Sequence, residues 1–387
     1  MSLRHWLQLA LAEGIGPILT QRLIDAAMGV DAACAASPKL LREVEGIGAA
    51  KSQQIFEALK RAGQQIDAEL ERAAAQNITI ISRDDEAYPA LLKSIPDPPS
   101  VLYIKGALEP RDLNALAVVG SRRCSFYGRE QAERFGALLA GAGISVVSGG
   151  ARGIDSAAHR GALAHPQGRT IAVLGCGVDS VYPAENAALF DMIKDRGAIV
   201  SEYPLGTPPL AENFPRRNRI VSGMSRGVLV IEADARSGAL ITARQACDDH
   251  GRPVFALPGR VDNKMSAGPH LLIRDGATLV TCLEDILEGL GPLPQSAVDL
   301  PLFDLSIAQG STEDEPTVDA PEPAAAPSGP LTPEQQAILS HLDGDALAAD
   351  AIIDRSGLPA QVVMRELTVM SLKGLIKRVD GQTYAKR

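Results

Sequence analysis

The sequence has few aromatic residues, no long apolar run and no paired cysteines. Aromatic residues make up 4% of the 387 residues, and no run approaches the roughly 18 apolar residues of a transmembrane helix. The five cysteines form no C-x-x-C pair and show no metal-ligand spacing. The apolar stretch near residue 8 is too short and interrupted for a signal peptide. We therefore expect a soluble cytoplasmic protein with reduced thiols and no membrane partner.

The glycine motifs that bind nucleotides in many α/β proteins are also missing. No G-x-x-x-x-G-K-[ST] loop occurs in the chain, and the most glycine-rich loop has Ser148 where G-x-G-x-x-G has its first glycine. The sequence therefore gives little support to the hypothesis that the protein binds a nucleoside triphosphate or a dinucleotide. We expect neither a cofactor nor a metal.

The chain has more acidic than basic residues, but most of this excess lies in one segment. The net charge is −9, and the segment 291–330 holds seven acidic residues and no lysine or arginine. Without that segment the charge is −2, so the whole-chain value says little about what the folded domains bind. A polyanionic ligand remains compatible with the sequence.

The length predicts two to three domains, and the pattern of the chain divides it into four parts. Residues 1–70 show helical periodicity and two Gly-Ile-Gly turns, 14–16 and 46–48, each of which precedes a helical stretch. This pattern resembles helix-hairpin-helix or SAM-like modules, in which helix amides approach a phosphate. A helical scaffold without a ligand explains the turns equally well.

Residues 75–290 alternate short apolar runs with longer helical stretches. The predicted strands are 116–119, 144–147, 170–174, 198–201, 228–231, 254–257 and 278–280, and helices are predicted within 129–139, 155–163, 184–194 and 239–248. Nearly continuous apolar strands between helices indicate a mainly parallel sheet covered on both faces. We expect an α/β, extended Rossmann-like domain.

The remaining residues predict a linker and a small C-terminal domain. The segment 291–330 is acidic, rich in proline and alanine and without periodicity, which is typical of a disordered linker. Beyond it, helices near 333–342, 348–355 and 359–373 precede a hairpin with an Asp380-Gly381 turn. Residues 331–387 therefore resemble a winged-helix domain, which binds either duplex DNA or only another protein.

Glycine- and arginine-rich loops follow the predicted strands, at the sheet edge where open α/β domains bind ligands. The loop after the second strand of this domain, residues 148–153, allows a tight turn with several amides at a helix start, as anion-binding loops have. The candidate residues in these loops are Gly120, Ser121, Arg122, Arg123, Ser148, Gly149, Gly150, Arg152 and Gly153.

A basic segment with one aromatic residue supplies the other candidates. Residues 213–219 contain Phe214, Arg216, Arg217, Asn218 and Arg219. Guanidinium groups bind phosphates and an aromatic face stacks on any base, which is the combination expected for a single-stranded nucleic acid. A solvated helix face is the alternative for this segment taken alone.

Catalytic groups are not apparent. Asp155 and His159 are four residues apart on a predicted helix, and such a pair is more often a local hydrogen bond than a catalytic dyad. Glu202 and Glu232, at strand ends, could orient arginines or, less favourably, act as bases. We expect no enzyme activity.

These motifs resemble the DNA-processing protein A family, also called Smf. The matching segments are 118–122, 148–159, 172–179, 182–183, 201–204, 213–219 and 236–244, in the family's order, over about 200 residues. The resemblance implies a homodimer that binds and protects single-stranded DNA and helps to load the RecA recombinase in natural transformation. It also implies that Arg122 is the main phosphate ligand, that Phe214 stacks on a base and that Arg216, Arg217 and Arg219 line the track.

The sequence departs from the family pattern at one place, and it leaves one competing function to be considered. Residues 210–212 are Leu-Ala-Glu where some relatives have a lysine. The competing function is a hydrolase of nucleotides or sugar phosphates with a related core, but the loop at 232–238 lacks the P-G-G-x-G-T-x-x-E signature of such phosphoribohydrolases. A purely scaffolding protein is a third alternative and would bind no oligonucleotide.

Overall fold

The computed structural model describes residues 3–292 and, nearer the C-terminus, 333–342, 347–356, 376–378 and 383–386, with single positions between them. The chain divides into two compact units, 1–308 and 309–387, which are described separately here. The predicted linker lies outside the described residues from 293 onward, as does the predicted Asp380-Gly381 turn. No described helix is long and apolar enough to cross a membrane.

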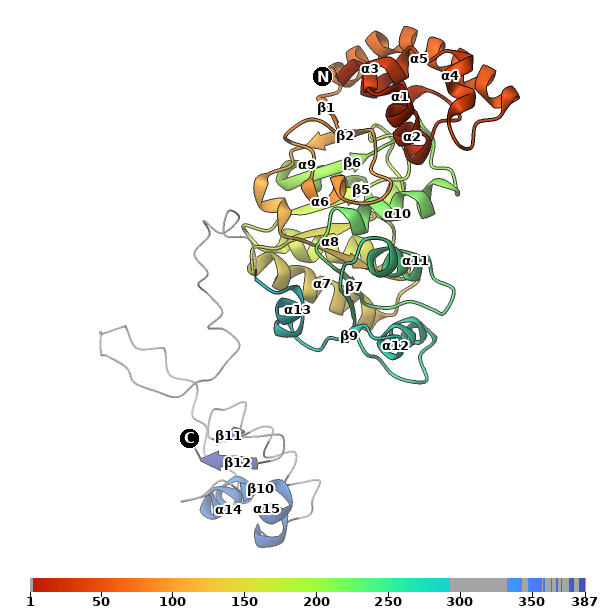
Figure 1. Ribbon diagram of the computed structural model, residues 1–387. Helices are drawn as coiled ribbons and strands as arrows, with labels where there is room; N and C mark the ends of the chain where they lie inside the picture. The colour runs from red at the N-terminus through yellow and green to blue at the C-terminus, as the bar shows by residue number, and fades with distance from the viewer. Residues whose placement is uncertain are drawn as a thin grey trace. The chain divides into compact units, whose positions relative to one another are not determined.

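Five helices open the first unit (Figure 1). They are α1 (Leu3–Leu11), α2 (Pro17–Ala27), α3 (Val30–Cys34), α4 (Pro38–Glu43) and α5 (Ala49–Ala75). Gly16 and Gly48 are the N-cap residues of α2 and α5, and both have extended backbone. Each Gly-Ile-Gly turn therefore leads directly into a helix.

A nine-stranded sheet forms the centre of the first unit, in the order β1-β2-β6-β5-β4-β3-β7-β8-β9. The strands are β1 (Ile78–Ser82), β2 (Val101–Gly106), β3 (Ala115–Val119), β4 (Ser145–Ser148), β5 (Thr170–Val173), β6 (Gly197–Ser201), β7 (Val228–Val230), β8 (Val254–Ala256) and β9 (Thr278–Leu279). The seven strands from β6 to β9 in this order are parallel, as predicted. The sequence analysis missed β1 and β2, which extend the sheet in antiparallel pairing.

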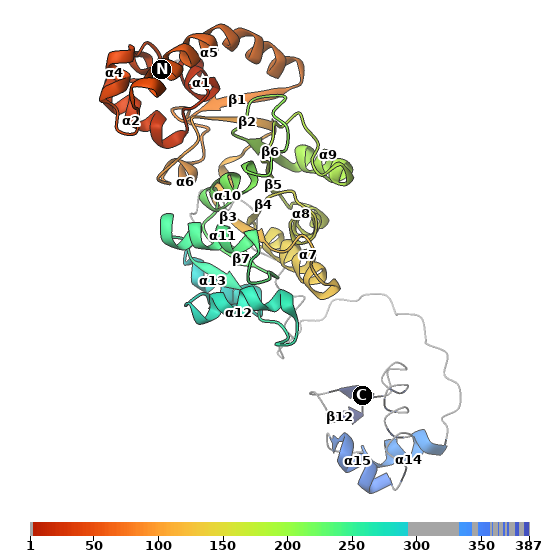
Figure 2. The same cartoon turned by 90° about the vertical axis from the view of Figure 1, so that its right-hand side faces the viewer.

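Helices cover both faces of this sheet, as Figure 2 shows for α10 and α11 on one side and α7 and α8 on the other. The helices of this region are α6 (Ala90–Lys93), α7 (Phe126–Gly141), α8 (Ile154–Ala164), α9 (Ala187–Arg196), α10 (Asn213–Gly223), α11 (Gly238–Arg244), α12 (Ala267–Arg274) and α13 (Leu283–Leu290). Phe135 of α7 and Ile154 of α8 pack on Val118, whereas Ile220 of α10 packs in a second core with Val119. This is the extended Rossmann-like arrangement that the sequence predicts.

The N-terminal helices share a hydrophobic core with the sheet. Leu59 and Ile66 of α5 belong to the same buried cluster as Tyr103 of β2 and Leu174, which follows β5. Glu69 of α5 is also buried, and its carboxylate accepts a hydrogen bond of 2.8 Å from the Leu205 amide. The helical part of this unit is thus joined to the loops that follow the strands.

The second unit has the elements of a winged helix. It contains α14 (Pro333–His341), β10 (Leu347–Ala348), α15 (Ala349–Ser356), β11 (Ile376–Arg378) and β12 (Thr383–Lys386). The strands form an antiparallel sheet in the order β10-β12-β11. Ile338 of α14, Ile352 of α15 and Tyr384 of β12 meet in one small core, to which Val363 and Leu367 also belong.

Candidate nucleic-acid interface

A groove lies at the carboxyl edge of the sheet, where the direction of the strand order changes. From β3 the chain adds β4, β5 and β6 on one side, and then crosses to place β7 on the other side of β3. The loops after β3 and β7 therefore diverge, which creates the crevice in which open α/β sheets bind ligands. The groove here has a volume of about 750 Å³ and is lined by loop residues after β3, β4 and β7 and by α10 and α11.

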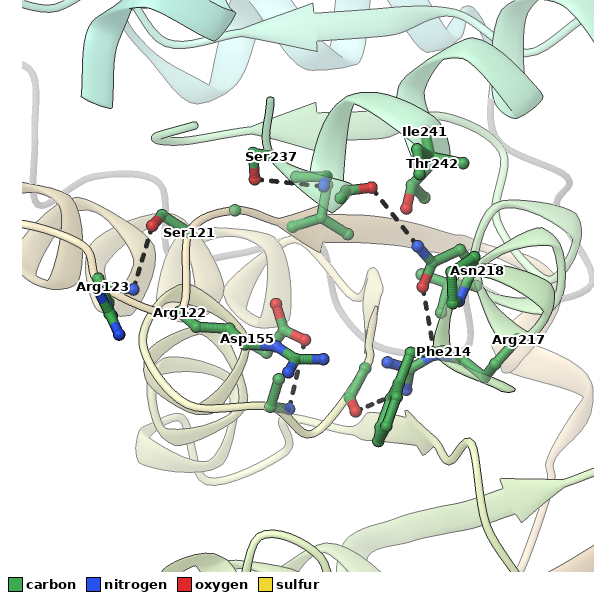
Figure 3. Close-up of a pocket in the computed structure, with 18 of the residues that line it drawn as sticks. Ser121, Arg122, Arg123, Asp155, Phe214, Arg217, Asn218, Ser237, Ile241 and Thr242 are labelled. Atoms are coloured by element: carbon green, nitrogen blue, oxygen red, sulfur yellow. Dashed lines mark hydrogen bonds between the residues drawn. The ribbon is translucent and has the colours of Figure 1, made fainter. Parts of the chain in front are cut away.

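Two aromatic rings and an arginine form the floor of this groove. The Arg122 guanidinium lies 4.9 Å from the centroid of the Phe214 ring, and Figure 3 shows it directed toward that ring. The Tyr182 ring is 5.5 Å from Phe214 at an interplanar angle of 43°, and both line the groove. An exposed guanidinium beside the half-buried Phe214 ring and the exposed Tyr182 ring offers a phosphate ligand and stacking faces at one place.

Arg217 supports this floor from below. Its side chain is only 3% exposed, and Nη1 donates a hydrogen bond of 2.6 Å to the Gly149 carbonyl and a second one to the Val173 carbonyl. Burial lowers the pKa of Arg217 to about 10, which leaves it charged at neutral pH. Its guanidinium lies 6.0 Å from the Phe214 centroid, so a buried cation holds the ring from one side.

Three helices start at the groove. Asp155 lies in the first turn of α8, Phe214 in that of α10 and Gly238 in that of α11, and all three line the groove. Helix starts carry partial positive charge and free amide groups, which favour anions such as phosphates. Asn218 ties α10 to α11, since its Nδ2 donates to the Gly238 carbonyl at 3.5 Å.

Two of the predicted glycines are required by close backbone packing. Gly153 has φ +77°, and a Cβ there would lie 2.3 Å from the Ser121 carbonyl oxygen. A Cβ on Gly120 would lie 2.5 Å from Ile154 Cγ1. These glycines let the loop after β3 and the loop after β4 lie against each other, which places Arg122 over the start of α8.

The glycine loop contributes less directly to the groove than its sequence suggests. Gly149 lines it, but Ser148 is buried and donates a 2.6 Å hydrogen bond to the Val118 carbonyl. Gly150 packs on the Phe190 ring. Arg152 is exposed outside the groove lining and is paired with Glu185, with Nη2 and Oε2 at 2.6 Å.

The basic segment 213–219 forms the start of α10. Its three arginine side chains differ in how far they are exposed to solvent. Phe214, Arg217 and Asn218 line the groove together with Gly120, Ser121, Arg122 and Arg123. Arg216 is exposed but is not part of the groove lining. Arg219 is buried and bound by two carboxylates, at 3.1 Å to Asp97 and 2.5 Å to Glu202. Arg219 is therefore held apart from the groove lining by its two carboxylate partners, and its contact with a strand stays a prediction.

The predicted acidic candidates are occupied by structural contacts. Asp155 Oδ2 accepts from the Ala151 amide at 3.3 Å, and His159 is hydrogen-bonded through Nδ1 to Thr170 Oγ1 at 2.6 Å, so the expected local bond between the two is replaced. Burial lowers the pKa of His159 to about 3. Glu202 orients Arg219, as one alternative proposed.

Glu232 binds no arginine among the residues described here. Its carboxylate accepts hydrogen bonds from the Ser125 amide and hydroxyl, both at 2.7 Å, and from Asn263 Nδ2 at 3.1 Å. Its role is therefore to join the loop that follows β3 to the loop that follows β8. No cluster of three metal-binding side chains is found in the part of the chain that the structure describes.

Several groove residues were not among the sequence candidates. Tyr182, Ser237, Ile241 and Thr242 line the groove, and Figure 3 shows the last three along the wall formed by α11. Tyr182 could have been found as one of the few aromatic residues in a loop after a predicted strand. The α11 residues could not be predicted from the sequence, since small polar and apolar side chains occur throughout the chain.

Comparison with known proteins gives the same relationship over most of the chain. The family model described as DNA recombination-mediator protein A matches residues 79–291, and the model of the DprA winged helix domain matches 322–382. Protein Smf of Escherichia coli is 41% identical over 317 residues, covering 79% of this chain and 76% of that protein. Protein Smf of Synechocystis is 35% identical over 400 residues, covering 99% and 98%.

A solved structure agrees with the sequence matches. DNA processing protein A of Streptococcus pneumoniae superposes with a TM-score of 0.64 at 36% identity, covering 74% of this chain and 98% of that one. These matches support the main functional interpretation over a nucleotide or sugar-phosphate hydrolase. The chain belongs to the DNA recombination-mediator protein A family.

Proposed function

We propose that this protein binds single-stranded DNA in the groove between the loops after β3 and β7. The observation that carries the proposal is the contact of Arg122 with Phe214 at 4.9 Å, beside the exposed Tyr182 ring. Stacking accepts every base, and the guanidinium contacts the phosphates between bases, so the site needs no sequence preference. Paired bases of a duplex cannot reach such rings without unstacking.

The electrostatics of the groove favour a polyanion despite the acidic chain. Arg122 and Arg123 are exposed at the groove, Arg217 lies beneath it and three helices start there. Asp155 and Asp234 also line the groove and oppose this charge, but Asp155 is mostly buried, and burial raises the pKa of its carboxyl group. The local field is therefore set by the arginines rather than by the net charge of −9.

The biological role that follows is that of a mediator of recombination in the cytoplasm. A protein that holds a single strand through its backbone and bases protects it from nucleases and can present it to a RecA recombinase. The family description as a recombination mediator supports this role. We further propose a homodimer that acts by binding and not by catalysis, as the family resemblance implies.

Fluorescence anisotropy with a labelled oligothymidylate tests the proposed function. Wild type is expected to bind, and Arg122→Ala is expected to bind about 10-fold or more weakly, because a charge-assisted phosphate contact is worth about 1.5–3 kcal/mol. Arg134→Ala is the matched control, since Arg134 is exposed on α7, beyond the groove lining. Equal binding by Arg122→Ala and wild type would remove Arg122 from the site. No binding by wild type would contradict the function itself.

A further inference from the structure

Three apolar side chains are exposed next to the groove, two in the first turn of α7 and one in the loop after β8. Phe126 is 79% exposed, Tyr127 45% and Val261 95%. A Phe side chain gains free energy when it leaves water, so a strongly exposed ring at a fixed helix start indicates a surface that a ligand covers. We call Phe126, Tyr127 and Val261 the apolar rim.

The apolar rim continues the groove along the carboxyl edge of the sheet. Arg123 lines the groove, and Phe126 follows it by three residues at the start of α7. Met265 also lines the groove, and Val261 precedes it by four residues in the loop after β8. The strand order β3-β7-β8 places these two loops on either side of β7.

One buried carboxylate fixes both loops of the apolar rim. Glu232, which follows β7, accepts hydrogen bonds from the amide and hydroxyl of Ser125 and from Asn263. A Cβ on Gly128 would lie 2.3 Å from Glu232 Oε2, so the first turn of α7 is pressed against this carboxylate. Phe126 is therefore presented on a rigid turn, which lowers the entropy lost when a ligand packs on it.

Basic residues outnumber acidic ones close to the apolar rim in the sequence. Arg123, Arg129 and Lys264 are exposed within three residues of a rim residue, as is the acidic Glu130. The carboxylate of Asp262 is offset by Arg260, with Nη2 and Oδ2 at 2.8 Å. An exposed aromatic ring with basic neighbours repeats, on a neighbouring loop, the chemistry of Phe214 and Arg122.

We propose that the apolar rim is a second base-stacking site for the same DNA strand, reached once the strand leaves the groove past Arg123. This inference rests on the proposed function. The occupant is a single strand because the rim is continuous with the groove and because basic side chains flank the ring. A strand long enough to occupy the groove alone does not touch Phe126, whereas a longer one does.

The test compares two oligothymidylates, one of about five nucleotides, near the lower end of the usual site sizes, and one of about 25, beyond their upper end. Phe126→Ala is expected to weaken binding of the long strand about 5- to 150-fold and to leave the short strand unchanged. Met28→Ala is the matched control, because Met28 is 93% exposed on the N-terminal helices. Thermal unfolding of Phe126→Ala should match wild type, since little of the ring is buried.

A spectroscopic arm reports contact directly. The Phe126→Trp variant places an indole on the rim, while the native Trp6 is buried and hydrogen-bonded to Asp84, so it supplies a constant background. Quenching of the new indole by the long strand alone supports the proposal. Equal affinity of Phe126→Ala and wild type for the long strand, or equal losses for both lengths, would overturn it. Failure of wild type to bind either strand would instead refute the proposed function.

Discussion

The substitution Phe214→Ala separates base stacking from phosphate binding. The Phe214 ring is half-buried, lies 4.9 Å from Arg122 and 5.5 Å from Tyr182, and rests on Gly175, where a Cβ would approach it to 3.2 Å. Removing the ring leaves the two exposed arginines of the loop after β3 in place. It therefore deletes the stacking face while the charges of the groove remain.

The expected loss follows from the number of bases that the ring can hold. Gly175 and Arg217 both lie against the Phe214 ring, so we expect it to stack on a single base, which is worth about 1–3 kcal/mol. Affinity should fall about 5- to 150-fold at fixed salt. Phe214→Leu keeps the contact with Gly175 but has no aromatic face, so it should lose nearly as much.

The assay is anisotropy with an oligothymidylate at several salt concentrations. Phe214→Ala should shift the curve of log affinity against log salt without changing its slope, because it removes no phosphate contact. Arg122→Ala should reduce the slope by about 0.7, the value for one contact to a single strand. Urea unfolding of each variant checks that the loss belongs to binding.

A changed slope for Phe214→Ala would refute the assignment of base stacking to Phe214 and of phosphate binding to Arg122. The ring would then act by positioning Arg122, and not by stacking on a base. Full affinity in Phe214→Leu would refute the stacking role in a different way, since any apolar side chain would suffice.

The remaining predictions concern stability. Arg219→Ala should lower the free energy of unfolding by about 3–5 kcal/mol, because it leaves Asp97 and Glu202 without their cation; urea unfolding measures this, and a loss below about 1 kcal/mol would show that Arg219 is dispensable. The lowered pKa of His159, about 3 when folded against 6.5 when exposed, means that unfolding takes up a proton between these values. Stability should therefore fall as pH falls through this window, by about 1.4 kcal/mol per pH unit, and His159→Gln should show a shallower fall; parallel curves would contradict this assignment. Gly153→Ala should cost about 1–3 kcal/mol of stability, because φ is +77° and the added Cβ would meet a carbonyl; an unchanged denaturation midpoint would argue against that constraint.

The sequence predicts the parallel strands well because their apolar runs are continuous. The strands β3 to β9 are each found within about two residues. For β3 to β8 the reason is burial on both faces, which leaves few polar residues in them, whereas both residues of β9 are exposed. The strands β1 and β2 escaped prediction. Thr79 is exposed within β1, and β2 pairs antiparallel with β6, so neither follows the strand-helix alternation that reveals the others.

The candidate site is predictable in outline and not in detail. Arg122 and Phe214 are identified because an arginine in a strand-end loop and an aromatic among arginines are unusual. Arg217 and Arg219 look alike in the sequence, yet one supports the Phe214 ring and the other is held by Asp97. Only the tertiary structure separates them, because their partners come from distant segments.

Photo-crosslinking tests the central claim most directly. An oligonucleotide that carries bromodeoxyuridine forms covalent bonds to aromatic side chains stacked on its bases, and peptide mapping then locates the contact. The groove account predicts crosslinks at Phe214 or Tyr182, which Arg122→Ala reduces. Crosslinks confined to residues 3–75 or 333–386, with none in the groove, would contradict it.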